Sequence, residues 1–423
     1  MRDARVGSGI AQHPKRTNLE TSMSTVRTAM VIGGGIAGPV TATALLKAGI
    51  DARLYEAYPG PSYNIGSGLA LAPNGVAALD IIEAGEAVRE IARPISKMGL
   101  SVGGKDIFMP GLSGLEPLQL VDRGELHRAL HDRAVAAGVP IEYNKRLIDV
   151  VEDESGITAR FADGSTATAD ALIGADGIRS TVRGLIDPDA PGPEYLNMLG
   201  FGAMIDYDGD IEPESMTFAF GKKAYYLYGA TGEGQVMWGA NLPHKEYLSL
   251  TAARAIPASH WLSILRETYA EDTPGGEFAR RTTEEQLEVV GALHIMPSVP
   301  HWFRGRMALV GDAVHAPSNS SGQGASLAIE SAIQVARCLR DLPTPEEAFA
   351  TYERLRRGRV EAVAARAAKA NHSKTLGPVG RKMMQLLAPV FVRMMDTEKT
   401  MGPEQRYRID WDAPVYKELA KTA

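Results

Sequence analysis

A glycine-rich turn near the N-terminus constrains the fold of this chain more than any other feature. The turn matches the pattern G-x-G-x-x-G and consists of Gly33, Gly34, Gly35, Ile36, Ala37 and Gly38. The apolar residues 29–32 before it predict a short buried strand, and residues 39–48 after it predict a helix that ends at Gly49. Such glycines let backbone N–H groups approach a pyrophosphate at the N-terminus of the helix. The pattern therefore predicts a site for a dinucleotide.

A second predicted strand supports this interpretation. Residues 52–55 are strand-like, and Glu56 follows them at a spacing suited to accepting hydrogen bonds from ribose hydroxyls. A strand, a glycine turn, a helix and a second strand form the βαβ opening of a doubly wound α/β domain. A glycine turn with only a structural role is the alternative, but this context favours dinucleotide binding.

Composition and charge exclude several other classes of protein. With 423 residues, 44% of them hydrophobic and 23% charged, the chain has globular proportions and is long enough for one large or two moderate domains. The formal net charge of −6 provides no positive field, so we expect no nucleic-acid partner. Cys338 is the single cysteine, and no Cys/His cluster has zinc-ligand spacing, which favours no metal and a reducing cytoplasm. No apolar run is long enough to span a membrane, which predicts a soluble protein.

The order of predicted elements divides the chain into lobes. After the α/β opening, strand-like stretches dominate, with one predicted helix over residues 258–269 among them. The predicted fold class is mixed α/β: a Rossmann-like domain with an inserted, mostly antiparallel sheet and C-terminal helices. The expected boundaries are 1–27 for a disordered leader, 28–194 with 297–370 for the α/β domain, 195–296 for the inserted sheet domain, and 371–423 for a helical segment.

Two further motifs place polar residues at the ends of predicted strands. Asp176 and Gly177 follow the apolar run 171–174, and polar groups at the carboxyl end of a strand commonly face the ligand crevice of an α/β sheet. An ordinary Asp-Gly turn is the alternative. Asp312 follows the apolar run 307–310, and its carboxylate could accept hydrogen bonds from a polyol such as a ribityl chain.

A second glycine-rich turn follows Asp312 and opens a long predicted helix. Its residues are Gly322, Gln323, Gly324 and Ala325. The turn offers backbone N–H groups and the positive end of a helix dipole, which would stabilise negative charge on the pyrimidine end of a reduced flavin. His315, which lies between the two features, is expected to have a structural role.

Taken in order along the chain, these motifs resemble those of the group A flavoprotein monooxygenases, the family with the p-hydroxybenzoate hydroxylase fold. The likeness runs from about residue 28 to about residue 367. By this resemblance, residues 33–38 and Glu56 hold the ADP half of FAD, and Asp312 binds the ribityl and pyrophosphate region. The full set of residues implied to bind FAD is Gly33, Gly35, Ile36, Ala37, Gly38, Glu56, Arg123, Asp176, Asp312, Gly322, Gln323, Gly324 and Ala325.

Two residues in that set have competing interpretations. The resemblance implies that Arg123 contacts FAD and that Asp176 belongs to a DG motif near FAD and the path of the transient nicotinamide. Without the resemblance, Arg123 is a residue at a helix start. The sequence also departs from the family pattern. Asn319 stands where a proline is usual after His315, Ser326 replaces a frequent asparagine, and the loop 58–66 lacks an arginine often found there.

The resemblance also implies a reaction. NADH or NADPH reduces FAD and leaves, oxygen adds to form a flavin C4a-hydroperoxide, and one oxygen atom is transferred to an organic small molecule. We expect hydroxylation, or epoxidation, of an aromatic substrate without a dedicated catalytic side chain. Period-2 alternation places Tyr226 and Tyr228 on one face of a strand, and we expect these residues and Met237 to line the substrate pocket. Packing within the sheet is the alternative for each.

Three other flavoprotein classes share the glycine turn. A flavin-dependent halogenase is disfavoured because the chain has no Trp-x-Trp-x-Ile-Pro segment. The same motifs also fit a flavin reductase or dehydrogenase that transfers no oxygen, and a flavin-binding protein without turnover. The sequence specifies neither the substrate nor the oligomeric state.

Overall fold

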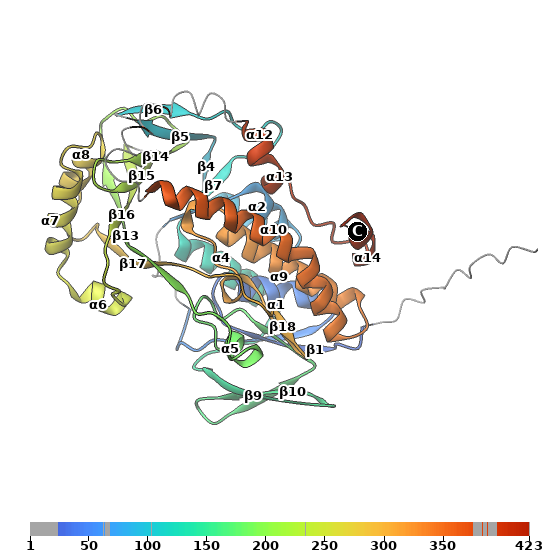
Figure 1. The fold of residues 1–423 in the computed structure, drawn as a ribbon. Coiled ribbons are helices and arrows are strands. Elements are labelled where there is room, and N and C mark those ends of the chain that lie inside the picture. The colour runs from blue at the N-terminus through green and yellow to red at the C-terminus, as the bar shows by residue number, and fades with distance from the viewer. Residues whose placement is uncertain are drawn as a thin grey trace, which may run out of the picture.

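The computed structural model describes residues 24–374, 383, 387 and 396–422, apart from residues 62, 64–67, 103 and 233. The expected leader therefore falls almost wholly outside the described residues. The described part is a mixed α/β structure built around two large sheets, as predicted (Figure 1).

A six-stranded sheet forms the centre of the first lobe. Its strands, in spatial order, are β18 (Phe303–Arg304), β19 (Met307–Leu309), β12 (Ala171–Gly174), β1 (Thr28–Ile32), β2 (Asp51–Tyr55) and β8 (Ile141–Glu142). All neighbours pair in parallel except β18 with β19. The predicted βαβ opening is confirmed, with α1 (Ala37–Lys47) connecting β1 to β2.

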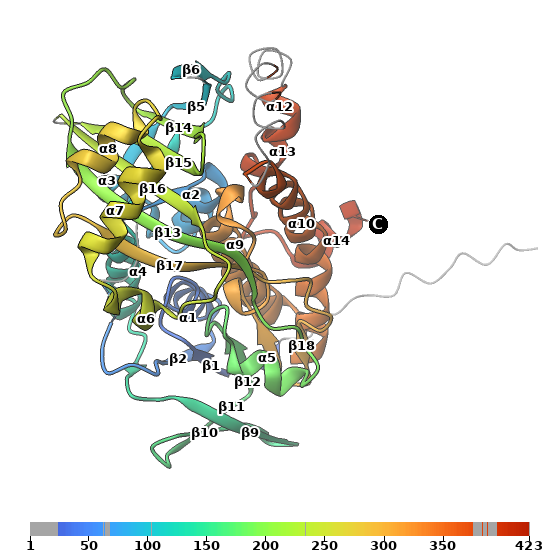
Figure 2. The same ribbon diagram turned by 60° about the vertical axis from the view of Figure 1, so that its left-hand side comes forward.

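Helices cover one face of this sheet and a smaller sheet covers the other (Figures 1 and 2). On the helical face, α1 packs along α9 (Gly324–Asp341) and α4 (Arg123–Ala136), and α10 (Pro345–Lys374) packs on α9. On the opposite face lie β9 (Leu147–Asp153), β10 (Gly156–Phe161) and β11 (Thr166–Ala169). Buried apolar side chains of these layers form the largest core of the protein.

A seven-stranded sheet forms the second lobe. Its order is β17 (Glu288–Ile295), β13 (Glu194–Asp206), β16 (Gln235–Pro243), β15 (Tyr225–Gly232), β14 (Ser215–Phe220), β5 (Lys97–Val102) and β6 (Lys105–Phe108). Neighbouring strands are antiparallel except β14 and β5, which are parallel. The sheet thus includes residues 97–108, which precede the stretch 195–296 in which the sheet was expected. The partners of this parallel pairing are far apart in the sequence, so no local pattern signals it.

Three helices cover the outer face of the second sheet, namely α6 (Leu250–Ala255), α7 (Ala258–Tyr269) and α8 (Gly275–Arg281) (Figure 1). The helix predicted over 258–269 is confirmed as α7. Large side chains such as Trp238, Trp261 and Phe278 fill the space between helices and sheet and form a second core.

A three-stranded sheet joins the lobes. Its strands are β3 (Leu69–Leu71), β7 (Leu118–Val121) and β4 (Arg93–Ile95). Ile95 and Leu120 of this sheet pack against Met216 and Met237 of the large second sheet. The remaining helices are α2 (Pro73–Asp80), α3 (Gly85–Ile91), α5 (Thr181–Ile186), α12 (Thr397–Thr400), α13 (Gly402–Gln405) and α14 (Val415–Thr422). Within the described residues, no helix is long and apolar enough to cross a membrane.

Candidate functional site

The glycines of the first turn have different structural roles. A Cβ on Gly38 would lie 1.8 Å from the Gly33 carbonyl oxygen, and a Cβ on Gly33, where φ is +103°, would lie 2.5 Å from the Ala175 carbonyl oxygen. These two glycines therefore allow the close packing of the turn. A Cβ on Gly35 would meet no heavy atom within 4 Å. The backbone at Gly35 thus borders open space, as a turn that receives a ligand requires.

Two helices begin at glycine-rich turns without a side-chain cap. The N-cap residues are Ile36 for α1 and Gln323 for α9, and neither side chain accepts a hydrogen bond from the first turn of its helix. By contrast, Asp122 caps α4 and Ser180 caps α5. The first N–H groups of α1 and α9 therefore remain available to an anion, which the helix dipole also favours.

Glu56 lies beside the turn and stabilises it. One carboxylate oxygen accepts a hydrogen bond from Gly34 N at 2.6 Å, and the other accepts from Tyr58 N at 2.8 Å. The residue is half-buried. A carboxylate has about four lone-pair positions, so Glu56 can also accept hydrogen bonds from ribose hydroxyls.

Helix α4 contacts the glycine turn through a residue that sequence reasoning missed. His127 lies on α4, is buried, and has its Nε2 2.6 Å from the Gly34 carbonyl oxygen. Because a carbonyl only accepts, His127 Nε2 donates this hydrogen bond. Arg123 precedes His127 by one helical turn and is exposed. The spacing of four residues from Arg123 was the available signal that both face the same region.

Asp312 lies where three segments of the first lobe meet. Asp312 is exposed to solvent, yet the protein around its carboxyl group desolvates it and raises its pKa. The positive charge of Arg123 opposes this shift. The preceding Gly311 has a φ of +59°, and a Cβ there would lie 3.0 Å from Ala37 Cβ and 3.2 Å from Ala328 Cβ. The end of β19, the start of α1 and the first part of α9 therefore meet beside Asp312.

His315 follows Asp312 but is directed into the core. Its Nε2 lies 2.9 Å from Ser331 Oγ on α9, and burial lowers its pKa to about 3. His315 is therefore neutral at physiological pH. Its contacts are those of the structural residue that we expected.

Asp176 is engaged mainly by its own turn. Its carboxylate accepts hydrogen bonds from Ser180 Oγ, from Thr181 N at 2.7 Å and from Val182 N at 3.1 Å. Burial raises its pKa, although these hydrogen bonds oppose the shift. The contacts are those of an Asp-Gly turn that anchors the start of α5, and they account for both carboxylate oxygens.

The second glycine-rich turn is held in place by contacts with α2. Gly322 has a φ of +60°, and the buried side chain of Gln323 accepts a hydrogen bond from Asn74 Nδ2 of α2 at 2.9 Å. Ser326, which replaces the frequent asparagine of the family, accepts a hydrogen bond from Ala72 N at 3.1 Å. Close packing of α2 on the start of α9 therefore fixes this turn.

The three residues expected to line a substrate pocket do not share a face of the sheet. Tyr228 pairs with Trp238, whereas Met237 pairs with Gly229. Residues opposite one another on antiparallel strands point to the same side, and successive residues along a strand point to opposite sides. Met237 therefore lies on the face opposite Tyr226 and Tyr228, so the register corrects the expectation that all three line one pocket.

The two tyrosines belong to the core beneath the outer helices. The ring of Tyr226 lies 5.2 Å from that of Tyr269, and the ring of Tyr228 lies 5.3 Å from that of Phe278. Tyr228 Oη donates a hydrogen bond to Asp106 at 2.7 Å, and burial raises the pKa of both phenols well above the usual value. Packing within the sheet, the alternative role, describes both residues.

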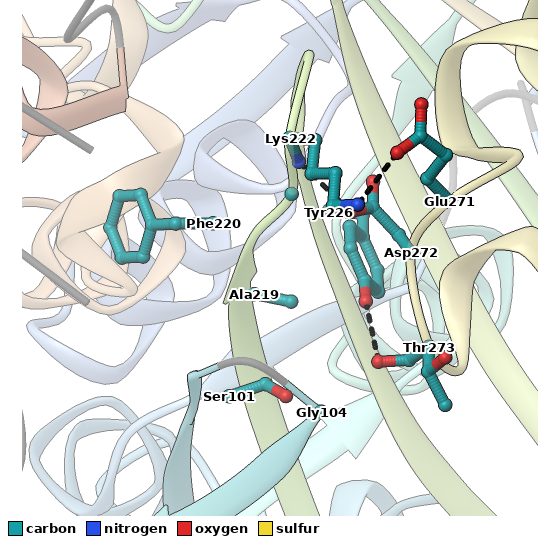
Figure 3. Close-up of a pocket in the computed structure, with 10 residues that line it drawn as sticks. Ser101, Gly104, Ala219, Phe220, Lys222, Tyr226, Glu271, Asp272 and Thr273 are labelled. Atoms are coloured by element: carbon teal, nitrogen blue, oxygen red, sulfur yellow. Dashed lines mark hydrogen bonds and ion pairs between the residues drawn. The ribbon is translucent and has the colours of Figure 1, made fainter. Parts of the chain in front are cut away.

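Two cavities in the described part of the chain lie away from the glycine turns. One, of about 170 Å³, is bordered by Tyr226 and by Lys222, which pairs with Glu271 at 2.6 Å (Figure 3). Figure 3 also shows the ring of Phe220 on the other side of its strand from Tyr226. The second cavity, of about 400 Å³, lies between β1–β2 and β10–β11. Neither includes Asp312 or a residue of the glycine turns, so neither belongs to the site described above.

Comparison with known proteins identifies the family. A family model described as an FAD binding domain matches residues 26–367. The chain belongs to the group A FAD-dependent monooxygenases. The FAD-dependent urate hydroxylase of Klebsiella pneumoniae is 27% identical over 355 residues, which are 81% of this chain and 88% of the relative. The 6-hydroxynicotinate 3-monooxygenase of Pseudomonas fluorescens is 29% identical over 368 residues, covering 79% of this chain and 88% of the relative.

Solved structures show the same fold. The Klebsiella pneumoniae protein HpxO, solved with FAD and uric acid, has a TM-score of 0.76 at 24% identity, over 91% of this chain and 97% of that chain. A tetrameric form of 2-methyl-3-hydroxypyridine-5-carboxylic acid oxygenase has a TM-score of 0.68 at 25% identity, over 83% and 94% of the two chains. The monooxygenase therefore uses FAD, with NADH or NADPH as the transient co-substrate of the family.

The described residues fit FAD. Gly35 borders open space, Glu56 retains acceptor capacity, and the start of α1 is uncapped. Asp312 is both exposed and surrounded by protein, as a group that faces a ligand from the base of a crevice would be. These features all belong to segments that meet where β1 and β19 end.

Proposed function

We propose that this monooxygenase binds FAD between the glycine turn after β1 and the uncapped start of α9. The close approach of Gly311 to Ala37 and Ala328, which brings Asp312 beside the starts of α1 and α9, supports this most strongly. The N–H groups at the start of α1 bind the pyrophosphate, and Glu56 binds the ribose. Asp312 accepts hydrogen bonds from the ribityl chain, with Arg123 beside it.

We infer a separate role for the start of α9. FAD, when bound, accepts reducing equivalents from NAD(P)H and supplies the oxygen-transfer chemistry. The first N–H groups of α9 stabilise the negative charge that accompanies reduction, because they lie at the positive end of the helix dipole. Gly322 and Gly324 have no side chains, so a planar ring can approach this backbone closely.

We propose that the substrate is a planar aromatic or heteroaromatic molecule that binds against the Met237 face of the second sheet. On this face Leu227 and Met237 are partly exposed, and Gly202 lies directly opposite Gly239. The glycine pair leaves a part of the sheet without side chains, which favours a flat ring. The named substrates of the two relatives, urate and 6-hydroxynicotinate, are heteroaromatic.

A screen of candidate substrates tests this proposal. The holoenzyme is mixed with NADH or NADPH and with phenols, hydroxypyridines, purines and, for comparison, aliphatic acids. We expect an aromatic compound to accelerate NAD(P)H oxidation and to be recovered as an oxygenated product. Oxygenation of only aliphatic compounds would contradict the substrate class without contradicting the FAD site.

A substitution on the sheet tests where the substrate binds. A Cβ on Gly239 would lie 3.5 Å from the nearest heavy atom, the Phe201 carbonyl oxygen, so the fold can accept alanine there. Gly239→Ala should raise KM for the aromatic substrate while FAD content stays unchanged. An unchanged KM would place the substrate elsewhere.

We also propose domain boundaries, a location in the cell and the small-molecule partners of this protein. The return of the chain to the first sheet through β19 supports an FAD-binding domain formed by 28–194, without β5 and β6, and by 297–370. The strands β5 and β6 pair with the sheet of the substrate domain and belong to that domain. A single buried cysteine, Cys338, supports a cytoplasmic location, where disulfides are rare. Dioxygen and one small organic molecule are the expected partners.

A further inference from the structure

A buried ionic cluster lies below the start of α9. Glu330 and Arg356 are both fully buried, and an Arg356 nitrogen lies 2.7 Å from a Glu330 oxygen. Arg359 adds two hydrogen bonds to the same carboxylate, at 2.8 and 2.9 Å. Glu330 follows Gln323 by seven residues, or about two helical turns. Two guanidinium groups against one carboxylate leave this cluster with a net positive charge.

Asn74 of α2 connects this cluster to the glycine-rich turn. Its Nδ2 donates to Glu330 Oε1 at 2.7 Å and to Gln323 Oε1 at 2.9 Å, and all three side chains are at least nine-tenths buried. Its Oδ1 is buried and has no hydrogen-bond partner among the described residues. The contact with Glu330 therefore determines how the Asn74 amide is oriented, although this orientation leaves Asn74 Oδ1 without a hydrogen bond.

Hydrogen-bond donors and acceptors determine how the amides of Asn74 and Gln323 are oriented. An ionised carboxylate only accepts hydrogen bonds, so Asn74 must turn its Nδ2 toward Glu330. The same Nδ2 then requires an acceptor from Gln323, which must turn its Oε1 toward Asn74. The Nε2 of Gln323, with two N–H donors, is consequently directed away from Asn74. Glu330 stays ionised because, although burial opposes its charge, Arg356, Arg359 and Asn74 hold its pKa below the usual range.

We propose that Glu330 and Asn74 are positioning residues that orient the Gln323 amide, so that its N–H donors support the negative charge of reduced FAD at the start of α9. This inference rests on the proposed FAD site. Gln323 would add side-chain donors to the backbone N–H groups of the helix, and the positive cluster beneath would act in the same direction. Glu330 and Asn74 themselves act only through Gln323.

The test is a double-mutant cycle with the flavin reduction potential of the holoenzyme as the readout. Gln323→Met removes the donors, and Asn74→Leu removes their orientation while leaving the Glu330 ion pairs in place. Each should weaken the preference of the protein for reduced over oxidised FAD by about tenfold, which lowers the potential by about 30 mV for a two-electron couple. The double variant should show little further change, because both substitutions remove the same interaction.

A matched control uses the same helix. Gln334 is another fully buried glutamine of α9, bonded to Arg337 and Glu418 rather than to the turn, so Gln334→Met should leave the potential unchanged. Additive shifts in the double variant, or an unchanged potential in Gln323→Met, would overturn the proposal. If Asn74→Leu does not fold, Gln323→Met and its control still decide. If the wild-type protein does not bind FAD, that result refutes the proposed FAD site, and it is distinct from a failure of the positioning role.

Discussion

Replacing Gly35 by valine should separate the loss of FAD from the loss of folding. A Cβ at this position meets no heavy atom within 4 Å, and Gly35 is not among the glycines with a left-handed φ. Valine therefore adds carbon atoms to the space in which we propose that the pyrophosphate lies. Since nothing in the protein occupies that space, the substitution should affect the ligand more than the fold.

The expected magnitudes follow from these contacts. A residue that replaces glycine without strain changes the free energy of unfolding by about 0.4–1 kcal/mol, and usually stabilises. Forcing extra methyl groups into a packed contact costs about 1–3 kcal/mol. If the bound pyrophosphate packs on Gly35, the Kd for FAD should rise by roughly 5- to 150-fold, at about 1.4 kcal/mol per tenfold.

The assay is titration of apoprotein with FAD, alongside denaturant unfolding of the apoprotein. Gly358→Val is the matched control, because Gly358 is exposed on α10 and its Cβ would also meet no heavy atom within 4 Å. The control should bind FAD like the wild type. If Gly35→Val binds FAD with unchanged affinity, the pyrophosphate does not lie at this turn.

Three other substitutions have distinct expected outcomes. Gly38→Ala should destabilise the apoprotein itself by about 1–3 kcal/mol or more in denaturant unfolding, because its Cβ would lie 1.8 Å from a carbonyl oxygen; an apoprotein of wild-type stability would refute this packing. Asp312 has a raised pKa, so the folded state binds more protons and stability falls as pH rises above the usual range of aspartate. Asp312→Asn apoprotein should therefore be more stable than wild type at pH 7 yet bind FAD more weakly. If the stability of the two apoproteins changed with pH in the same way, the raised pKa of Asp312 would be contradicted. Glu330 has a lowered pKa, so the stability that its ionised form adds is present at neutral pH and is lost as pH falls below the usual range of glutamate. Glu330→Gln should lower the free energy of unfolding by about 3–5 kcal/mol at pH 7, because it leaves buried arginines unpaired. A smaller loss of stability would argue against a charged Glu330.

Local sequence patterns predicted most of the first lobe and one helix of the second. The apolar strand at 29–32, the helix after the glycine turn and the helix at 258–269 are set by periodicity and by glycines with local conformational roles. Such signals act over a few residues, so they are visible without knowledge of tertiary contacts. The motifs at Asp312 and Gly322 were visible for the same reason.

Long-range pairing was not predictable in this way. The parallel pairing of β5 with β14 joins segments that are far apart in the sequence, and no sequence pattern within residues 97–102 predicts it. Period-2 alternation grouped Tyr226 with Tyr228 correctly, but only the register of β15 with β16 shows that Met237 faces the other side. The Asn74–Glu330 contact likewise depends on how α2 packs on α9.

The most direct test of the central claim follows the fate of dioxygen. The holoenzyme is supplied with NADH or NADPH, an aromatic compound that accelerates their oxidation, and dioxygen enriched in a heavy oxygen isotope. The account predicts that the organic product gains a single labelled oxygen atom and that the other labelled atom appears in water. Consumption of NAD(P)H with all the label recovered as hydrogen peroxide, and none in any organic compound, would contradict it.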